Sequence, residues 1–161
     1  MKHLKALVTI SVLAALHGTV SAQVSPFVAA QVDAAVRPCA DLAGATAGLP
    51  EAQAKAVAIA ALTPCYEALQ SLDAFERNNG SGMTPEERNY FYFAGGNVIW
   101  MTAASETMKN DGRLNAPICE QVRAAEAAWS NVDVPAGTSV DIDMRTNDLR
   151  RMLLPACTQQ R

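Results

Sequence analysis

Histidine is almost missing from this chain of 161 residues. Its two histidines, His3 and His17, both lie within the first 22 residues, which have the features of an export signal. A mature chain without them has no Ser-His or Cys-His catalytic pair, no histidine general base and no histidine metal ligand. Most familiar hydrolase and transition-metal sites are thereby excluded, and the sequence assigns no catalytic, cofactor-binding or metal-binding residue.

The chain also lacks an apolar run of the roughly 20 residues that a membrane-spanning helix needs. Its most apolar stretch, 6–16, follows Lys2 and Lys5 and precedes the small residues Val20-Ser21-Ala22. This order is typical of a secretory signal peptide that is cleaved after the last of these residues. We therefore predict a signal peptide at 1–22, a single disulfide-stapled domain at 23–161, and a periplasmic or secreted location.

Lysine and aromatic residues are scarce as well. Aromatic residues make up 6% of the chain, whereas half of its residues are hydrophobic, many of them alanine. Because alanine has the highest helix propensity, the composition favours an all-α fold, a compact bundle of about five helices. Removal of Lys2 and Lys5 would change the formal net charge from −3 to −5. This acidic balance argues against nucleic acid and anionic membranes as partners.

Four cysteines each follow a proline by one or two residues: Cys39, Cys65, Cys119 and Cys157. An even number behind an export signal predicts two disulfides, for which three connectivities are possible. We favour Cys39–Cys65 and Cys119–Cys157, since each bond would then join neighbouring helices at proline-marked ends. The sequence has no Cys-x-x-Cys pair, the spacing that redox-active thiols and zinc sites use.

Local signals place the first two helices on either side of a glycine-containing turn. Ser25-Pro26 predicts a helix start, with an apolar stripe of Phe27, Ala30 and Ala34 that ends near Arg37. Pro38 should break or kink this helix and leave Cys39 at the bend. A second helix should begin near Pro50-Glu51, with a kink or a new start at Thr63-Pro64. Its predicted core-facing residues are Leu62, Cys65, Tyr66, Leu69, Leu72 and Phe75.

The clearest local signal is Thr84-Pro85-Glu86-Glu87, a capping box that opens a third helix running to about Asn110. The pair Gly95-Gly96 within it would allow close packing or a kink. Its predicted apolar side comprises Tyr90, Phe93, Ala94, Val98, Met101, Ala104 and Met108.

A fourth helix should begin at Asn115-Ala116-Pro117, with an apolar face of Ile118, Val122, Ala125 and Trp129. Residues 132–144 fit either a hairpin or the start of a helix capped by Thr138. We favour the helix, in which Leu149, Met152 and Leu153 form an apolar edge up to Pro155.

For several polar residues, a structural role in a helix explains the pattern better than catalysis or metal binding does. Glu86-Glu87 could supply a carboxylate for glycoside hydrolysis, but the capping box accounts for Glu87. Ser105 and Lys109 are four residues apart, as in a nucleophilic pair, yet a lysine at a helix end is ordinary. The aspartates Asp133, Asp141 and Asp143 lack a calcium-loop pattern and suit the first turn of a helix. A small basic face for an acidic partner could be formed by Arg145, Arg150 and Arg151.

The order of features from Tyr90 to Cys157 is a helix with Gly95-Gly96, then Ile118-Cys119, then Trp129, then Leu153-Leu154-Pro155-Ala156-Cys157. This order resembles small periplasmic immunity proteins that neutralise type VI secretion amidases, which are helical and disulfide-bonded. The resemblance covers about half of the mature chain. Cys65 lies well upstream of where those proteins tend to carry a cysteine, and no functional residue is carried over.

Two classes of function are compatible with these features. The first is a non-catalytic protein that binds another periplasmic or extracellular protein, as an inhibitor, immunity factor, adaptor or chaperone. The second is an envelope enzyme that uses carboxylates alone, such as a glycosidase or lyase. Two carboxylates facing each other across a concave site would favour the enzyme, whereas an exposed apolar or arginine-rich patch would favour binding.

Overall fold

The computed structural model describes residues 24–130, 147 and 149–158. Within them lie five α-helices: α1 (Pro26–Gly44), α2 (Glu51–Asn79), α3 (Pro85–Lys109), α4 (Ala116–Ser130) and α6 (Leu154–Thr158). A short 3-10 turn, η2 (Gly80–Gly82), joins α2 to α3, and a π-helical segment, η3 (Leu149–Leu153), leads into α6. The predicted all-α class with two disulfides is confirmed.

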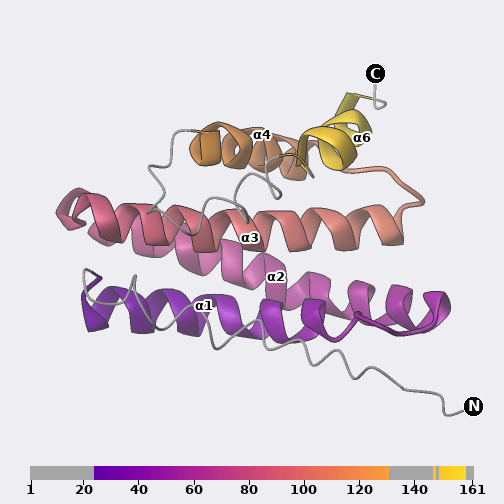
Figure 1. The fold of residues 1–161 in the computed structure, drawn as a ribbon, viewed down its shortest axis with the longest axis horizontal. Coiled ribbons are helices and arrows are strands. Elements are labelled where there is room, and N and C mark those ends of the chain that lie inside the picture. Colours follow the sequence, from indigo (N-terminus) through magenta and orange to yellow (C-terminus); the bar gives the residue numbers. More distant parts are fainter. Residues whose placement is uncertain (1–23, 131–146, 148, 159–161) are drawn as a thin grey trace, which may run out of the picture.

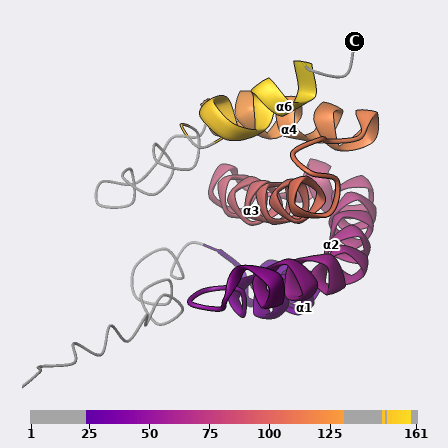
Figure 2. The same cartoon turned by 90° about the vertical axis from the view of Figure 1, so that its right-hand side faces the viewer.

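The long helix α3 lies between two groups of helices. It packs with α1 and α2 on one side, while α4, η3 and α6 cover another side (Figures 1 and 2). Each side has its own apolar cluster. The first is built around Val28, Val32, Leu72, Phe91 and Val98, and the second around Leu114, Ile118, Val122, Leu149 and Leu153.

The helix starts predicted within the described residues are confirmed. Ser25 is the N-cap of α1, where its Oγ accepts a hydrogen bond from the amide of Val28 at 3.4 Å. Thr84 opens α3 with both hydrogen bonds of the capping box. These starts follow from nearby residues alone, because a cap satisfies backbone amides within its own first turn.

Of the alternatives predicted at Pro38, the break is wrong, because α1 continues through Pro38 to Gly44. At Pro64 the new start is wrong, because α2 continues through it. A proline inside a helix removes one backbone hydrogen bond and costs about 3 kcal/mol. Packing of α1 against α2, with Cys39 and Cys65 buried between the two helices, offsets this cost.

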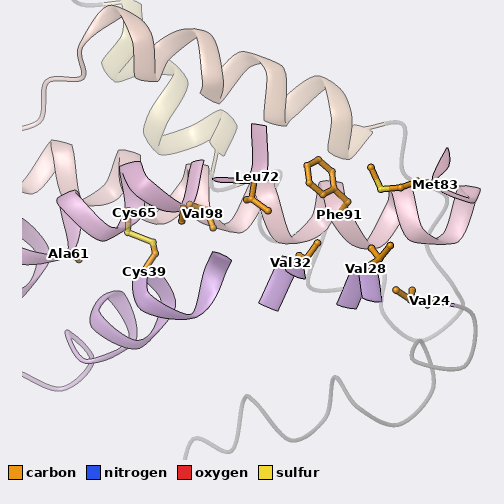
Figure 3. Packing of buried hydrophobic residues seen from close by; sticks show 11 residues of the cluster. Val24, Val28, Val32, Cys39, Ala61, Cys65, Leu72, Met83, Phe91 and Val98 are labelled. Carbon is orange, nitrogen blue, oxygen red and sulfur yellow. A yellow bond between two sulfur atoms is a disulfide. The ribbon is translucent and has the colours of Figure 1, made fainter. Parts of the chain in front are cut away.

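The structure pairs Cys39 with Cys65 and Cys119 with Cys157. The expectation that both bonds lie at helix ends is wrong for the first, whose cysteines lie inside α1 and α2 (Figure 3). Pro38 and Pro64 immediately precede these cysteines, so the covalent link holds the two helices at the level where each lacks a hydrogen bond. Cys119 and Cys157 do lie near the ends of α4 and α6.

The predicted apolar stripe of α1 is also wrong. Phe27 is 59% exposed, and Ala30 and Ala34 are exposed as well. The helix instead buries Val28 and Val32, together with Cys39, against α2 and α3. Valine fills more core volume than alanine, so burial of the valine face removes more apolar surface from water.

The predicted faces of α2 and α4 agree with the structure, whereas that of α3 agrees in part. Of the predicted side of α3 only Val98 is buried, and Phe91 and Ala103, which were not part of that side, are buried as well. In α2 the predicted stripe is buried or half-buried, and in α4 Ile118, Val122 and Ala125 are buried. Met108 near the end of α3 and Met152 in η3 are exposed instead. Gly96 of the glycine pair is buried within an uninterrupted α3, so that helix has no break there. The side chain of Trp129 lies outside the described residues.

The C-terminal prediction is tested only in part, because residues 132–144 lie outside the described residues. The helical backbone continues beyond the predicted apolar edge, since η3 is followed directly by α6, which begins at Leu154 and runs through Pro155 to Thr158. Leu149 and Leu153 are buried, as the predicted apolar edge requires.

Candidate functional site

The segment η3 divides its side chains between the core and the surface. Leu149 and Leu153 point into the second apolar cluster. Arg150, Arg151 and Met152 are exposed, and Met152, at 63%, has the largest exposed fraction of the large apolar side chains in the described residues. We call these three residues the C-terminal patch. It has the composition expected of a binding surface, because methionine and arginine are enriched at protein interfaces.

The C-terminal patch is held in place on both sides. The Nε of Arg150 donates a hydrogen bond to Oε1 of Glu126 on α4 at 2.7 Å. The Cys119–Cys157 disulfide joins α4 to α6, the helix that directly follows the patch. The π-helical geometry of η3 is itself rare and is often found at functional sites.

Of the predicted basic face, Arg150 and Arg151 lie together on η3, whereas Arg145 lies outside the described residues. The sequence predicted Met152 as part of an apolar edge that faces the core. In the structure its side chain is exposed, next to Arg150 and Arg151. The exposure of Met152 follows from the burial of both Leu149 and Leu153. Their spacing of four residues orients one side of the segment inward and leaves the intervening residues outside.

A buried polar cluster connects α2, α3 and the start of α4. Glu106 is 5% exposed, and its Oε1 accepts a hydrogen bond from the Tyr66 hydroxyl at 3.0 Å. Its Oε2 accepts from the Asn110 side chain. Asn115 donates to the Tyr66 hydroxyl at 3.4 Å and caps α4 through the amide of Ile118. Each carboxylate oxygen of Glu106 therefore has a neutral donor, so the cluster ties three helices together.

Burial within this cluster raises the pKa of Tyr66, and the neighbouring carboxylate of Glu106 raises it further, while the Asn115 hydrogen bond lowers it. The tyrosine is therefore held as a neutral donor. Sequence reasoning did not find the cluster, although an acidic residue on a largely apolar stretch of helix was a usable signal. The neighbouring Ser105 is buried while Lys109 is exposed, so the two residues do not form an accessible nucleophilic pair.

The carboxylate of Glu87 bridges the starts of two helices. Its Oε2 accepts a hydrogen bond from the amide of Thr84 at 2.9 Å, as the capping box predicts. Its Oε1 accepts from the amide of Ser25 at 3.2 Å, so the same side chain also contacts the start of α1. Hydrogen bonds from Ser25 and then from Thr84 lower the pKa of Glu87. The contact with Ser25 was not predicted, because it joins residues 62 positions apart.

Two hollows lie on the described surface. One, of about 340 Å³, lies at the helix starts and has Phe27, Asn79 and Glu87 among its lining residues. The other, of about 630 Å³, lies along α1 and is lined by Ala30, Asp33, Ala34, Arg37, Pro38 and Asp41. The aspartates of this second hollow both belong to α1, two turns apart, so they do not face each other.

Two further observations concern the described residues only. They include no group of three or more histidine, cysteine, aspartate or glutamate residues placed to hold a metal ion. None of their helices is long and apolar enough to cross a bilayer. The predicted aspartate group Asp133, Asp141 and Asp143 falls outside them.

Comparisons with protein-family models, with curated proteins and with solved structures find no match.

Proposed function

We propose that this chain is an exported, non-catalytic helical protein that binds another protein through the C-terminal patch. The proposal includes cleavage of the signal peptide at 1–22 and a periplasmic or secreted location. Two disulfides support this location, because such bonds persist in oxidising compartments.

The exposure of Met152 beside Arg150 and Arg151 carries the proposal. The side chain of Met152 is 63% exposed, so its burial by a partner would remove apolar surface from water. The Cys119–Cys157 disulfide anchors the helix that follows η3, so the backbone of the patch loses little conformational freedom on binding. Arg151 offers a charge to the rim of such a contact, and an acidic surface with an apolar centre is the complement that fits.

The described carboxylates support the enzyme alternative less well. Glycoside hydrolysis needs two carboxylates on opposite sides of the bond to be cleaved. Asp33 and Asp41 lie on one helix, and both oxygens of Glu87 accept backbone hydrogen bonds. Binding is therefore the function that the described geometry supports best.

Affinity capture with the oxidised protein as bait in an envelope extract tests the proposal, with captured proteins identified by mass spectrometry. The double variant Met152→Ala/Arg151→Glu removes the apolar centre and reverses the charge of the C-terminal patch. We expect its affinity for the captured partner, measured by calorimetry with both proteins purified, to fall at least about tenfold.

The variant Met108→Ala/Arg113→Glu is the matched control, since it makes the same two changes at exposed positions outside the patch, at the C-terminal end of α3 and in the segment that follows it. It should bind as the wild type does. Equal loss in both variants would show that the C-terminal patch is not the binding site. Absence of any stoichiometric partner, together with turnover of an envelope glycan, would overturn the binding function in favour of the enzyme.

A further inference from the structure

One face of α1 packs against no other helix of the described structure. Its inner face packs Val28 and Val32 against α2 and α3. Its outer face, which we define as Ala30, Asp33, Ala34, Arg37, Pro38 and Asp41, is exposed and forms the hollow of about 630 Å³. Because three of these six residues are small and apolar, another helix could approach this face closely.

The charges of the outer face follow a pattern along the helix. Asp33, Arg37 and Asp41 are four residues apart and so lie on the same side of α1. Asp33 Oδ1 accepts a hydrogen bond from the Tyr90 hydroxyl, which leaves its other oxygen available. Among the described residues, no ion pair or hydrogen bond joins the guanidinium of Arg37. Its charge is therefore available to an acidic group outside this chain.

Pro38 adds an acceptor to the same face. Because proline has no amide hydrogen, the carbonyl of Ala34 lacks the donor that it would have in an uninterrupted helix. A guanidinium has five donors and can bond a carboxylate and a carbonyl together. The outer face thus offers one cation, two carboxylates and one unused carbonyl beside small side chains.

We propose that the outer face of α1 binds the same face of a second copy of this chain, with the two helices antiparallel. A two-fold axis at the level of residue 35 lies midway between Asp33 and Arg37, about 3 Å along the helix from each. This axis places Asp33 of each chain against Arg37 of the second copy and brings the two Ala34 residues close together. The interface is self-complementary, as two-fold contacts must be.

Charge complementarity selects the second copy as the occupant. One two-fold operation forms two opposite-charge pairs from a single aspartate and a single arginine. A parallel, in-register pair would instead place Asp33 against Asp33 and Arg37 against Arg37. The fit comes from one surface alone, so no property of a foreign protein has to be assumed.

The dimer leaves the C-terminal patch free. Helix α1 and the segment η3–α6 lie on different sides of α3 (Figure 2). Two patches on one dimer would raise the apparent affinity for a partner that presents two sites. The dimer does not depend on the proposed function, because it involves none of the residues of the C-terminal patch.

Sedimentation equilibrium over a concentration series, on oxidised protein with its intact mass recorded, tests the proposal. We expect the wild type to reach twice the monomer mass. Arg37→Asp places like charges opposite each other and should raise the dimer dissociation constant about 100-fold or more. Arg77→Asp is the matched control, because it makes the same change in the exposed i,i+4 pair Asp73–Arg77 on α2 and should leave the dimer intact.

A mixing experiment distinguishes the proposed antiparallel pairing of Asp33 with Arg37 from other modes of dimerisation. Asp33→Arg chains and Arg37→Asp chains should each remain monomeric, but their mixture should form a one-to-one heterodimer with both charge pairs restored. Asp33→Arg also loses the Tyr90 hydrogen bond, so circular dichroism verifies its fold. Ala34→Glu, at an exposed position on the axis, should abolish the dimer independently. A monomeric wild type, or a dimer that survives Arg37→Asp and Ala34→Glu, would overturn the proposal.

Discussion

One disulfide joins the helices on each side of α3, but the helices that it joins differ in length. On one side, the Cys39–Cys65 disulfide joins helices of 19 and 29 residues at positions inside both. On the other, the Cys119–Cys157 disulfide joins a helix of 15 residues to one of five. We call these the N-terminal region (α1 and α2) and the C-terminal region (α4, η3 and α6).

The difference shows what a disulfide adds to helices of unequal length. The bonds close loops of 26 and 38 residues, for which chain entropy predicts similar stabilisation, about 3.5 and about 4 kcal/mol. Long helices such as α1 and α2 have extensive packing besides the bond. A helix of five residues is too short to persist by itself. The second bond therefore decides whether α6 and the adjoining patch keep their place.

The two regions also differ in charge. The N-terminal region contains six acidic and three basic residues, whereas the C-terminal region contains two acidic and three basic residues. The N-terminal region is therefore acidic, while the C-terminal region is slightly basic. The arginines of the C-terminal patch lie in the slightly basic region, which makes an acidic partner electrostatically acceptable there.

Among the changes that test the difference between the two regions, removal of the disulfides should have the largest effect on stability. Cys119→Ala/Cys157→Ala should lower the free energy of unfolding by about 4 kcal/mol. It should also increase native-state hydrogen exchange in 149–158, because α6 loses its anchor. Cys39→Ala/Cys65→Ala is the counterpart and should cost about 3.5 kcal/mol, with exchange rising to a similar extent in all helices through global unfolding and not preferentially in α1 and α2. Equal exchange changes in both regions of Cys119→Ala/Cys157→Ala would show that the two bonds do not differ in this way.

A smaller effect is expected from matched cavities in the two clusters. Leu149→Ala and Leu72→Ala each remove a buried leucine and should each cost about 3 kcal/mol in chemical denaturation. Since α3 packs against both regions, each variant should unfold in a single transition. A separate early transition in Leu149→Ala alone would mean that the C-terminal region unfolds independently.

The smallest effect concerns Glu87, which links the start of α1 to the start of α3. The pKa of Glu87 lies below its ordinary value of 4.5, so its carboxylate stabilises the fold fully above about pH 4.5. That stabilisation is lost as the pH falls through the lowered pKa. Glu87→Gln should therefore be less stable than the wild type at neutral pH, and the difference should shrink in acid. Thermal unfolding from pH 7 to pH 3 measures this difference.

Glu86→Gln is the control, because Glu86 is the exposed neighbour of Glu87 in the same first turn. Its stability should run parallel to that of the wild type across the same pH range. A parallel curve for Glu87→Gln as well would mean that the bridge between Ser25 and Thr84 does not depend on the charge of Glu87.

Features within one or two helical turns were predictable from the residues involved. Ser25-Pro26 and Thr84-Pro85-Glu86-Glu87 start helices because their side chains satisfy nearby amides. The face of α4 was predictable for a similar reason, since Ile118, Val122 and Ala125 recur at the helical period. The effect of Pro38 and Pro64 was not predictable in this way, because their local cost is visible in the sequence and the packing that offsets it is not.

The sequence by itself determined the helical class, the starts of α1 to α4 and the even set of cysteines, since these depend on propensity, capping and composition. Only the tertiary structure decided which face of α1 is buried, because the choice between Phe27-Ala30-Ala34 and Val28-Val32 depends on where α2 and α3 lie. It also brought Ser25 to Glu87, Tyr66 to Glu106 and Met152 to the surface. Such contacts join distant residues, and no local energy term specifies them.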